Sequence, residues 1–159
     1  DQIRQQDRGF YVEPENVGRQ VGEGAELEIR WSLRRDLTLR GWYAYQYNTD
    51  ETTGEDAGYS PHHRLYGSLQ YHWGRSFFNL QGTYVGERAR VAEDPRSEPP
   101  QYGQLDLLVR HDLDQHVSLQ LDIRNLLDAQ LEEAAPGTLL PQDLPLPGRN
   151  YYATLEMRF

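Results

Sequence analysis

Hydrophobic and polar residues alternate with a period of two along most of this chain, which is typical of β-strands with one apolar face. In the segment around residues 24–33, for example, Leu27, Ile29 and Trp31 alternate with Glu28 and Arg30. The pattern predicts seven strands. They lie roughly at residues 24–33, 37–47, 64–73, 76–86, 102–111, 117–127 and 149–159.

The rest of the chain gives weaker signals. Residues 10–22 read as an upward extension of the first strand, and residues 1–8 read at best as the stub of another. No proline falls inside the seven alternating runs, as central sheet positions require, and we find no amphipathic helix. The segment 128–147 contains four prolines and is predicted to be a loop.

The connections between the predicted strands alternate between short and long. Turns at residues 34–36, 74–75 and 112–116 are short, whereas three long loops cover residues 48–63, 87–101 and 128–148. In an antiparallel up-and-down meander, alternate connections lie at the same end, so all three long loops would share one end. Outer-membrane barrels have this asymmetry, with short periplasmic turns and long outer loops.

The polar face of the predicted strands carries many charges for a protein interior. Burying so many ions would cost several kcal/mol each unless they were well paired, whereas facing a wet lumen or a polar plug costs little. The apolar face has aromatic residues near both ends and aliphatic residues between them, like the two aromatic girdles of a membrane barrel. The polar face carries Glu26, Glu28, Arg30, Arg40, Asp106, Arg110, Asp122, Arg124, Glu156 and Arg158.

A seven-stranded sheet cannot close comfortably in lipid, because unpaired edges are costly there and bacterial single-chain barrels have even strand numbers from about 8 upward. We therefore expect one segment, residues 1–159, of a larger transmembrane barrel. A small barrel of eight strands that recruits residues 1–8 is the second possibility. The chain begins at Asp1 without an initiator methionine or signal peptide, so we expect a processed or excised piece.

Composition narrows the function classes. The 16 basic residues are all arginine, against 25 acidic residues and a formal net charge of −9, which argues against a nucleic-acid partner. Cysteine is absent, which excludes thiolate catalysis and disulfides. The three long loops hold four acids each and three arginines in total, so the net negative charge sits at their end.

Candidate chemistry is sparse. No nucleophile–base–orienter set is evident, and we expect neither an enzyme nor a bound cofactor. His62 and His63, near Glu55 and Asp56, could be considered a metal site, but adjacent residues of an extended chain point to opposite sides, so we expect no metal there. Asp122 and Glu156 each precede an arginine by two residues and are predicted to form ion pairs in the lumen.

Several motifs resemble the C-terminal part of TonB-dependent outer-membrane receptors. Asn125-Leu126-Leu127-Asp128 resembles the family's Asn-Leu-Phe-Asp before the last outer loop, with Leu127 in place of phenylalanine. Pro147-Gly148-Arg149 resembles the Pro-Gly-Arg that opens the last strand, and Phe159 resembles the terminal aromatic that serves as the barrel assembly signal.

The resemblance implies a fragment of an active transporter in the bacterial outer membrane. Its parent would bind a scarce, bulky small-molecule chelate, such as an iron–siderophore or cobalamin-like compound. It would be energised by the TonB complex through a plug domain that we expect to be absent from this chain. Outer-membrane lipid would be the other partner, and an isolated fragment with free edges would self-associate.

The alternative from another class is a soluble β-sandwich or small barrel that acts as a ligand-binding or adhesion module. It predicts a second sheet over the apolar face. No ligand-binding residues can be assigned from the sequence.

Overall fold

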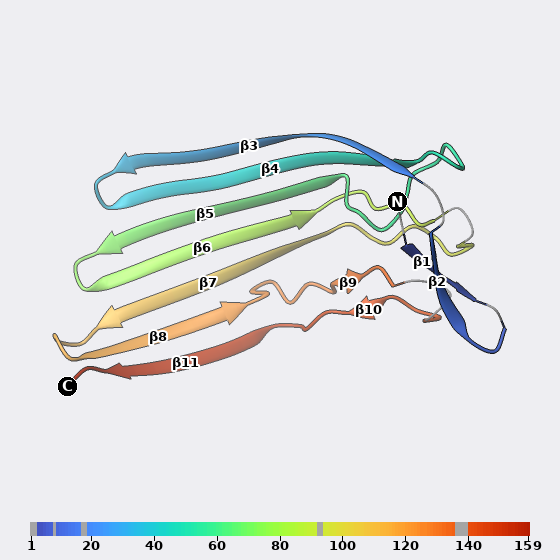
Figure 1. Ribbon diagram of the computed structural model, residues 1–159. Helices are drawn as coiled ribbons and strands as arrows, with labels where there is room; N and C mark the ends of the chain where they lie inside the picture. The colour runs from blue at the N-terminus through green and yellow to red at the C-terminus, as the bar shows by residue number, and fades with distance from the viewer. Residues whose placement is uncertain (1–2, 8, 17–18, 92–93, 136–139) are drawn as a thin grey trace.

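The computed structural model describes residues 3–7, 9–16, 19–91, 94–135 and 140–159. Its main feature is one antiparallel sheet of seven strands in the order β11-β8-β7-β6-β5-β4-β3 (Figure 1). Consecutive strands are neighbours throughout, so the predicted all-β up-and-down meander is confirmed. The strands are β3 (Gln20–Arg34), β4 (Leu37–Asp50), β5 (His63–Trp73), β6 (Ser76–Val85), β7 (Tyr102–Asp112), β8 (Val117–Arg124) and β11 (Asn150–Met157).

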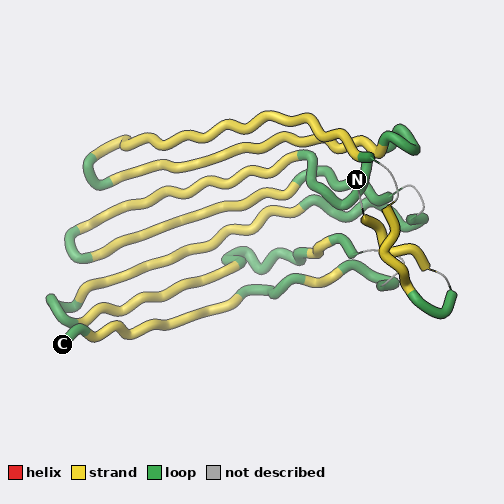
Figure 2. Tube along the Cα trace, in the orientation of Figure 1, coloured by secondary structure: helices red, strands yellow, loops and turns green. Residues whose placement is uncertain are grey.

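The sheet is a long open ribbon with two different ends (Figures 1 and 2). One end, which we call the short-turn end, holds the connections 35–36, 74–75 and 113–116 together with the C-terminus. The opposite end holds the connections 51–62, 86–101 and 125–149, which we call the loop layer. Strands β3 and β11 are the two edges of the sheet in the described part of the chain.

The register keeps apolar residues opposite apolar residues across all seven strands. One row of Cα partners crosses the whole sheet at Trp31, Leu39, Leu69, Leu80, Leu107, Ile123 and Tyr151. The adjacent row, on the other face, includes Arg40, Ser68, Gln81 and Asp106. Because a shift of one residue would exchange the two faces, this agreement between strands fixes the pairing.

Strand boundaries differ from the sequence pattern where the backbone changes direction. Strand β8 ends at Arg124 instead of 127, because Asn125 and Asp128 have the positive φ values of 52° and 54°. Strand β11 ends at Met157, so Phe159 follows the strand. At the other edge, β3 begins at Gln20, so residues 20–22 of the expected upward extension belong to this strand.

Two small sheets were not predicted. Residues 12–16 do not extend β3. They form β2 (Val12–Asn16), which pairs antiparallel with β1 (Ile3–Asp7) in a separate hairpin at the same end of the sheet as the loop layer. Pro14 is one reason why β2 lies outside the main sheet, because a residue without an N–H suits a strand that is paired on one side only. Within the segment predicted to be only loop, β9 (Glu132–Glu133) pairs with β10 (Leu144–Pro145).

Buried apolar side chains lie at one end of the molecule. Among the residues described, the buried hydrophobic ones are Ala57, Val85, Leu131 and Ala135, all within the loop layer or directly beside it. Among the described strand residues, only Val85, at the end of β6 next to the loop layer, belongs to this buried set. Within the described ranges there is also no helix with the length and apolarity needed to cross a membrane.

Candidate functional site

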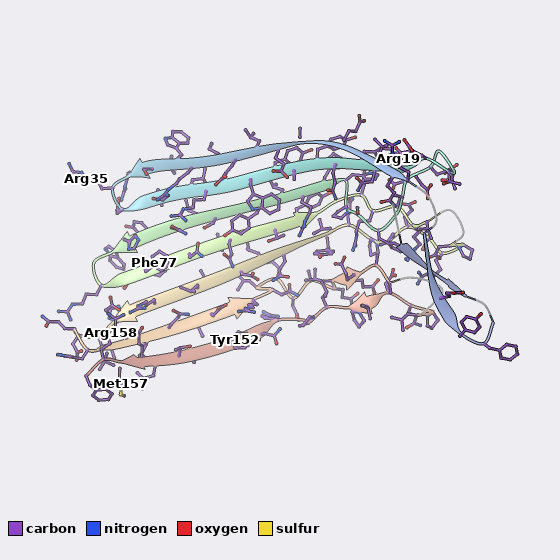
Figure 3. The ribbon with its side chains drawn as sticks, in the orientation of Figure 1. Arg19, Arg35, Phe77, Tyr152, Met157 and Arg158 are labelled. Atoms are coloured by element: carbon purple, nitrogen blue, oxygen red, sulfur yellow. The ribbon has the colours of Figure 1, made fainter. Side chains whose placement is uncertain are left out.

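The apolar face of the sheet is open. Leu27 is 67% exposed, Leu69 38% and Leu155 53%, although each is a large aliphatic side chain in the middle of a strand. Figure 3 shows side chains standing on both sides of the ribbon, and no second sheet packs over either face in the described part of the chain. The cover that a soluble sandwich requires is therefore missing from the described residues, and large aliphatic side chains remain exposed on this face.

The polar face carries ion pairs near the short-turn end. Arg110 Nη1 lies 3.1 Å from Glu156 Oε2, and Arg158 Nη2 lies 2.8 Å from Glu156 Oε1. Further along β8, toward the loop layer, Asp122 pairs with Arg124 at 3.8 Å. Both carboxylates that could suggest acid–base chemistry therefore have arginine partners. Such a network suits a wall that faces water or another polar protein surface.

Aromatic residues occupy the same polar face nearer to the loop layer. Trp42 and Tyr66 are stacked with ring centroids 6.2 Å apart, and the Arg64 guanidinium lies 6.0 Å from the Trp42 ring centre. Near the other edge of the sheet, on the same face, the Arg124 guanidinium lies 5.0 Å from the Tyr152 ring centre. Rings with guanidinium groups over them form a surface that can contact aromatic, anionic or polar groups.

The Asn125 and Pro147 motifs come together at the top of β8 and β11. Asn125 is 1% exposed. Its Oδ1 accepts a hydrogen bond from the Ala129 N–H at 2.9 Å, and its Nδ2 donates to the carbonyls of Ala129 at 2.9 Å and Pro147 at 3.4 Å. The Asn125 N–H donates to Asp106 Oδ1 at 2.8 Å. One buried amide thus ties the end of β8 to the chain entering β11.

We call this junction between the end of β8 and the start of β11 the cap, and Asp128 adds further contacts to it. Its Oδ1 accepts from the Arg149 N–H at 2.9 Å, and its Oδ2 lies 3.3 Å from Arg149 Nη2. These hydrogen bonds, first from the backbone and then from the side chain of Arg149, lower the pKa of Asp128. Gly148 fits beside them, because a Cβ there would lie 3.2 Å from Asp128 Oδ1.

The other motif residues stand apart from this cap. Leu126 contributes its N–H to the Leu105 carbonyl at 2.6 Å, whereas the Leu127 side chain is 72% exposed. Phe159 is fully exposed at the short-turn end. The structure therefore gives a local role to Asn125, Asp128, Gly148 and Arg149, and leaves Leu127 and Phe159 facing outward.

The two adjacent histidines share one acidic neighbour, because His63 Nε2 lies 3.9 Å from the Glu87 Oε2 that His62 also approaches, but their other partners differ. His62 Nε2 forms a short contact with Asp56 Oδ2, and its Nδ1 lies 3.6 Å from Glu87 Oε2. His63 Nδ1 is 2.7 Å from the Tyr43 hydroxyl. Within the described ranges, no group of three or more acidic or histidine side chains has an arrangement that could hold a metal ion.

Sequence reasoning missed a charged cluster inside the loop layer. Arg90 lies 2.5 Å from Asp143, and Arg96 lies 2.5 Å from Asp94. Their side chains are largely buried, with 6% of Arg90 and 2% of Asp94 exposed. The available signal was three arginines in an acidic loop, but Asp143, the partner of Arg90, lies in another loop 53 residues later in the sequence.

A family model described as "TonB dependent receptor-like, beta-barrel" matches residues 1–126. The chain belongs to this family. TonB-dependent receptors are outer-membrane transporters rather than enzymes, and the chain is a portion of their barrel. The matched residues include Asn125 and Leu126 and stop before Asp128, Pro147 and Phe159.

Solved TonB-dependent receptors share the fold of this portion. "Copper transporter OprC" matches with a TM-score of 0.78 and 17% identity over 99% of this chain and 26% of its own. The ferric-catecholate import receptor Fiu from E. coli K12, in its closed form, matches with 0.75 and 19% over 99% and 23%. A mutant of the ferric enterobactin receptor PfeA from Pseudomonas aeruginosa matches with 0.74 and 20% over 93% and 24%.

The chain spans about a quarter of the length of these receptor structures. A comparison with curated proteins found no match. The relatives are named for copper and for iron chelates, so membership in the family leaves the type of ligand open.

Proposed function

We propose that this chain is the C-terminal barrel wall of an outer-membrane receptor that imports a scarce, bulky metal chelate, of the iron–siderophore or cobalamin type. The observation that carries the proposal is the two-faced sheet. Its exposed aliphatic face suits lipid, and its polar face carries ion pairs and aromatic–arginine contacts that suit a lumen.

The two edges of the sheet support a larger parent barrel. In the part of the chain that the structure describes, strands β3 and β11 are each paired on one side only, and an unpaired edge cannot remain in lipid. Further strands of the parent would pair with both edges. Isolated from them, the chain should self-associate through its edges or its apolar face.

The proposed transport step belongs to the whole receptor. The parent would bind the chelate between its outer loops and its lumen wall. It would release the chelate inward when the TonB complex acts on a plug domain. This chain would supply seven wall strands and three outer loops. Similar structures include receptors named for ferric catecholate and ferric enterobactin as well as a copper transporter, so the test uses both kinds of probe.

Uptake by the bacterium that encodes the full-length receptor tests this proposal. Cells with and without the gene, each with and without TonB, are given radioactive iron as ferric enterobactin or as ferripyoverdine, radioactive cobalamin, or copper salt. We expect one chelate to accumulate only when both the gene and TonB are present. Fractionation should place the receptor in the outer membrane. Equal uptake of every probe by all four strains would refute the transport assignment, and recovery in the soluble fraction would refute the barrel.

A further inference from the structure

The first two connections of the loop layer run side by side. The Tyr59 N–H donates to the Ala89 carbonyl at 2.6 Å, and the His62 N–H donates to the Glu87 carbonyl at 2.7 Å. A β-bridge links Pro61 and Arg88. These backbone contacts join two loops that the sequence separates by a full β-hairpin.

Gly58 permits this close approach. Its φ of 81° is unfavourable for other residues, and a Cβ at this position would lie only 2.7 Å from the Val91 nitrogen. The neighbouring Ala57 is 4% exposed. Loop 51–62 therefore packs against loop 86–101 at a distance that only glycine allows.

Arg88 joins the second loop to the third. Its side chain has no exposed surface. Both terminal nitrogens lie 3.2 Å from the Glu132 carbonyl oxygen, and Nη2 also donates to the Pro100 carbonyl. The guanidinium lies 5.2 Å from the ring centre of Tyr102, whose hydroxyl donates to Glu133 at 3.1 Å. The buried cation thus holds loop 86–101, loop 125–149 and the start of β7 together.

A second set of charges ties the same two loops. Arg90 donates to both carboxylate oxygens of Asp143, at 3.0 and 2.5 Å. Arg96 pairs with Asp94 and donates to the Ala135 carbonyl at 2.5 Å. The Ala135 N–H in turn donates to Asp143 Oδ1 at 3.1 Å. Ala135 is fully buried, so the ion pairs surround a small apolar centre.

This packing differs from that of ordinary surface loops, which have few buried contacts and open at low free-energy cost. When a buried ion pair loses one partner, the other charge remains without compensation, which is far more disruptive than loss of an exposed pair. All three arginines of loop 86–101 are used in internal contacts. The loop layer thus has the burial and pairing of a small folded core.

We propose that the described residues of the loop layer form a preformed rigid block that opens only as one unit, and that Arg88 and the Arg90–Asp143 pair hold it closed. The block presents a fixed surface beside the aromatic part of the polar face. Loop movements that accompany ligand entry would then belong to other outer loops of the parent receptor. The block forms whether or not the receptor transports a chelate, because its contacts lie within this chain.

Hydrogen exchange of the full-length receptor in membranes tests for a single block. Peptides from residues 56–63, 86–91 and 131–135 should exchange slowly and at a common opening rate. Asp143→Asn and Arg90→Gln should each speed exchange at least about tenfold in all three peptides. The double variant should accelerate exchange by less than the product of the two single effects, because both changes break the same Arg90–Asp143 pair. Glu98→Gln, which removes an exposed carboxylate from the same loop, should leave the rates unchanged.

Acceleration limited to the loop that carries the substitution would overturn the proposal, as would additive effects in the double variant. Gly58→Ala is a second test of cooperative opening, because it disturbs the contact between the first two loops and leaves the Arg90–Asp143 pair in place. It should speed exchange in residues 86–91 and 131–135 as well as in its own loop. Barrel assembly is checked for each variant by its heat-dependent mobility on a gel. If the Asp143 and Arg90 variants do not assemble, Gly58→Ala alone decides between one block and three independent loops.

Discussion

The buried amide of Asn125 gives the sharpest test of the local structure. Asn125→Ala removes one acceptor and one donor group that together form three hydrogen bonds, to the Ala129 N–H and to the carbonyls of Ala129 and Pro147. The site is almost fully buried, so water cannot easily replace them. A hydrogen bond contributes about 0.5–1.5 kcal/mol, and the contact at 3.4 Å is weak. We expect the cap between β8 and β11 to lose roughly 2–3 kcal/mol.

Hydrogen exchange at the Arg149 amide measures this loss. That amide donates to Asp128 Oδ1, which the substitution does not alter, so faster exchange reports opening of the cap as a whole. At about 1.4 kcal/mol per factor of ten, exchange should accelerate roughly 30- to 150-fold. Asn150→Ala, which loses only an exposed contact to Gly148, is the control and should have little effect.

Asn125→Gly separates hydrogen bonding from backbone strain. Asn125 has a φ of 52°, which glycine adopts freely and alanine does not. Asn125→Gly should therefore be slightly less harmful than Asn125→Ala, and both should be far worse than Asn150→Ala. Unchanged exchange at Arg149 in Asn125→Ala would refute the view that this amide holds the cap.

Three further predictions address the barrel, the loop layer and the terminus. Leu69→Arg should reduce barrel assembly by placing a charge in lipid at about 2–4 kcal/mol, whereas Gln70→Arg on the opposite face should assemble normally; equal yields of folded barrel would contradict the assignment of faces. Arg96 lowers the pKa of Asp94 to about 2, and Arg90 lowers that of Asp143, by side-chain hydrogen bonds. Because folding lowers the pKa of these carboxyl groups, their ionised forms stabilise the loop layer at pH values above the ordinary pKa of 3.8, and this stabilisation is lost as the pH falls toward about 2. Pepsin should therefore cut the loops at a pH of about 2 but not at about 4, when its activity at each pH is normalised with an unfolded substrate. Deletion of Phe159 should lower the amount of assembled receptor without changing the hydrogen exchange of the Asn125 cap, because the two lie at opposite ends of β11; a normal amount would remove its role as an assembly signal.

The sheet was predictable because the alternation of apolar and polar residues within each strand shows which residues lie on each of its two faces. The alternation of Leu119, Leu121 and Ile123 with Gln120 and Asp122 needs no information from other parts of the chain, and strand order follows from short connections. Strand ends were less predictable. Asn125 and Asp128 are common turn residues, but their positive φ values, which end β8, depend on contacts with Ala129 and Arg149.

The loop layer could not be read from local patterns. Arg88 contacts Glu132, and Arg90 contacts Asp143, so both partners lie far along the sequence from the arginines. The acidic composition of the loops indicated solvation and gave no sign of burial. The Asn125 and Pro147 motifs were recognisable by resemblance, yet only the structure shows that one amide joins them.

Lipid contact of the apolar face is the claim on which the rest depends, and it can be measured with a spin label on a single cysteine introduced into this portion, which contains none of its own. Leu80 and Gln81 are neighbours in the central strand β6 and lie on opposite faces. A nitroxide attached to Leu80→Cys in the membrane-embedded receptor should collide often with oxygen, which dissolves in lipid, and rarely with a water-soluble nickel chelate. The same label at Gln81→Cys should lack that lipid signature. A Leu80 label that collides with the nickel chelate, or with neither reagent as in a dry protein core, would contradict the membrane-barrel account.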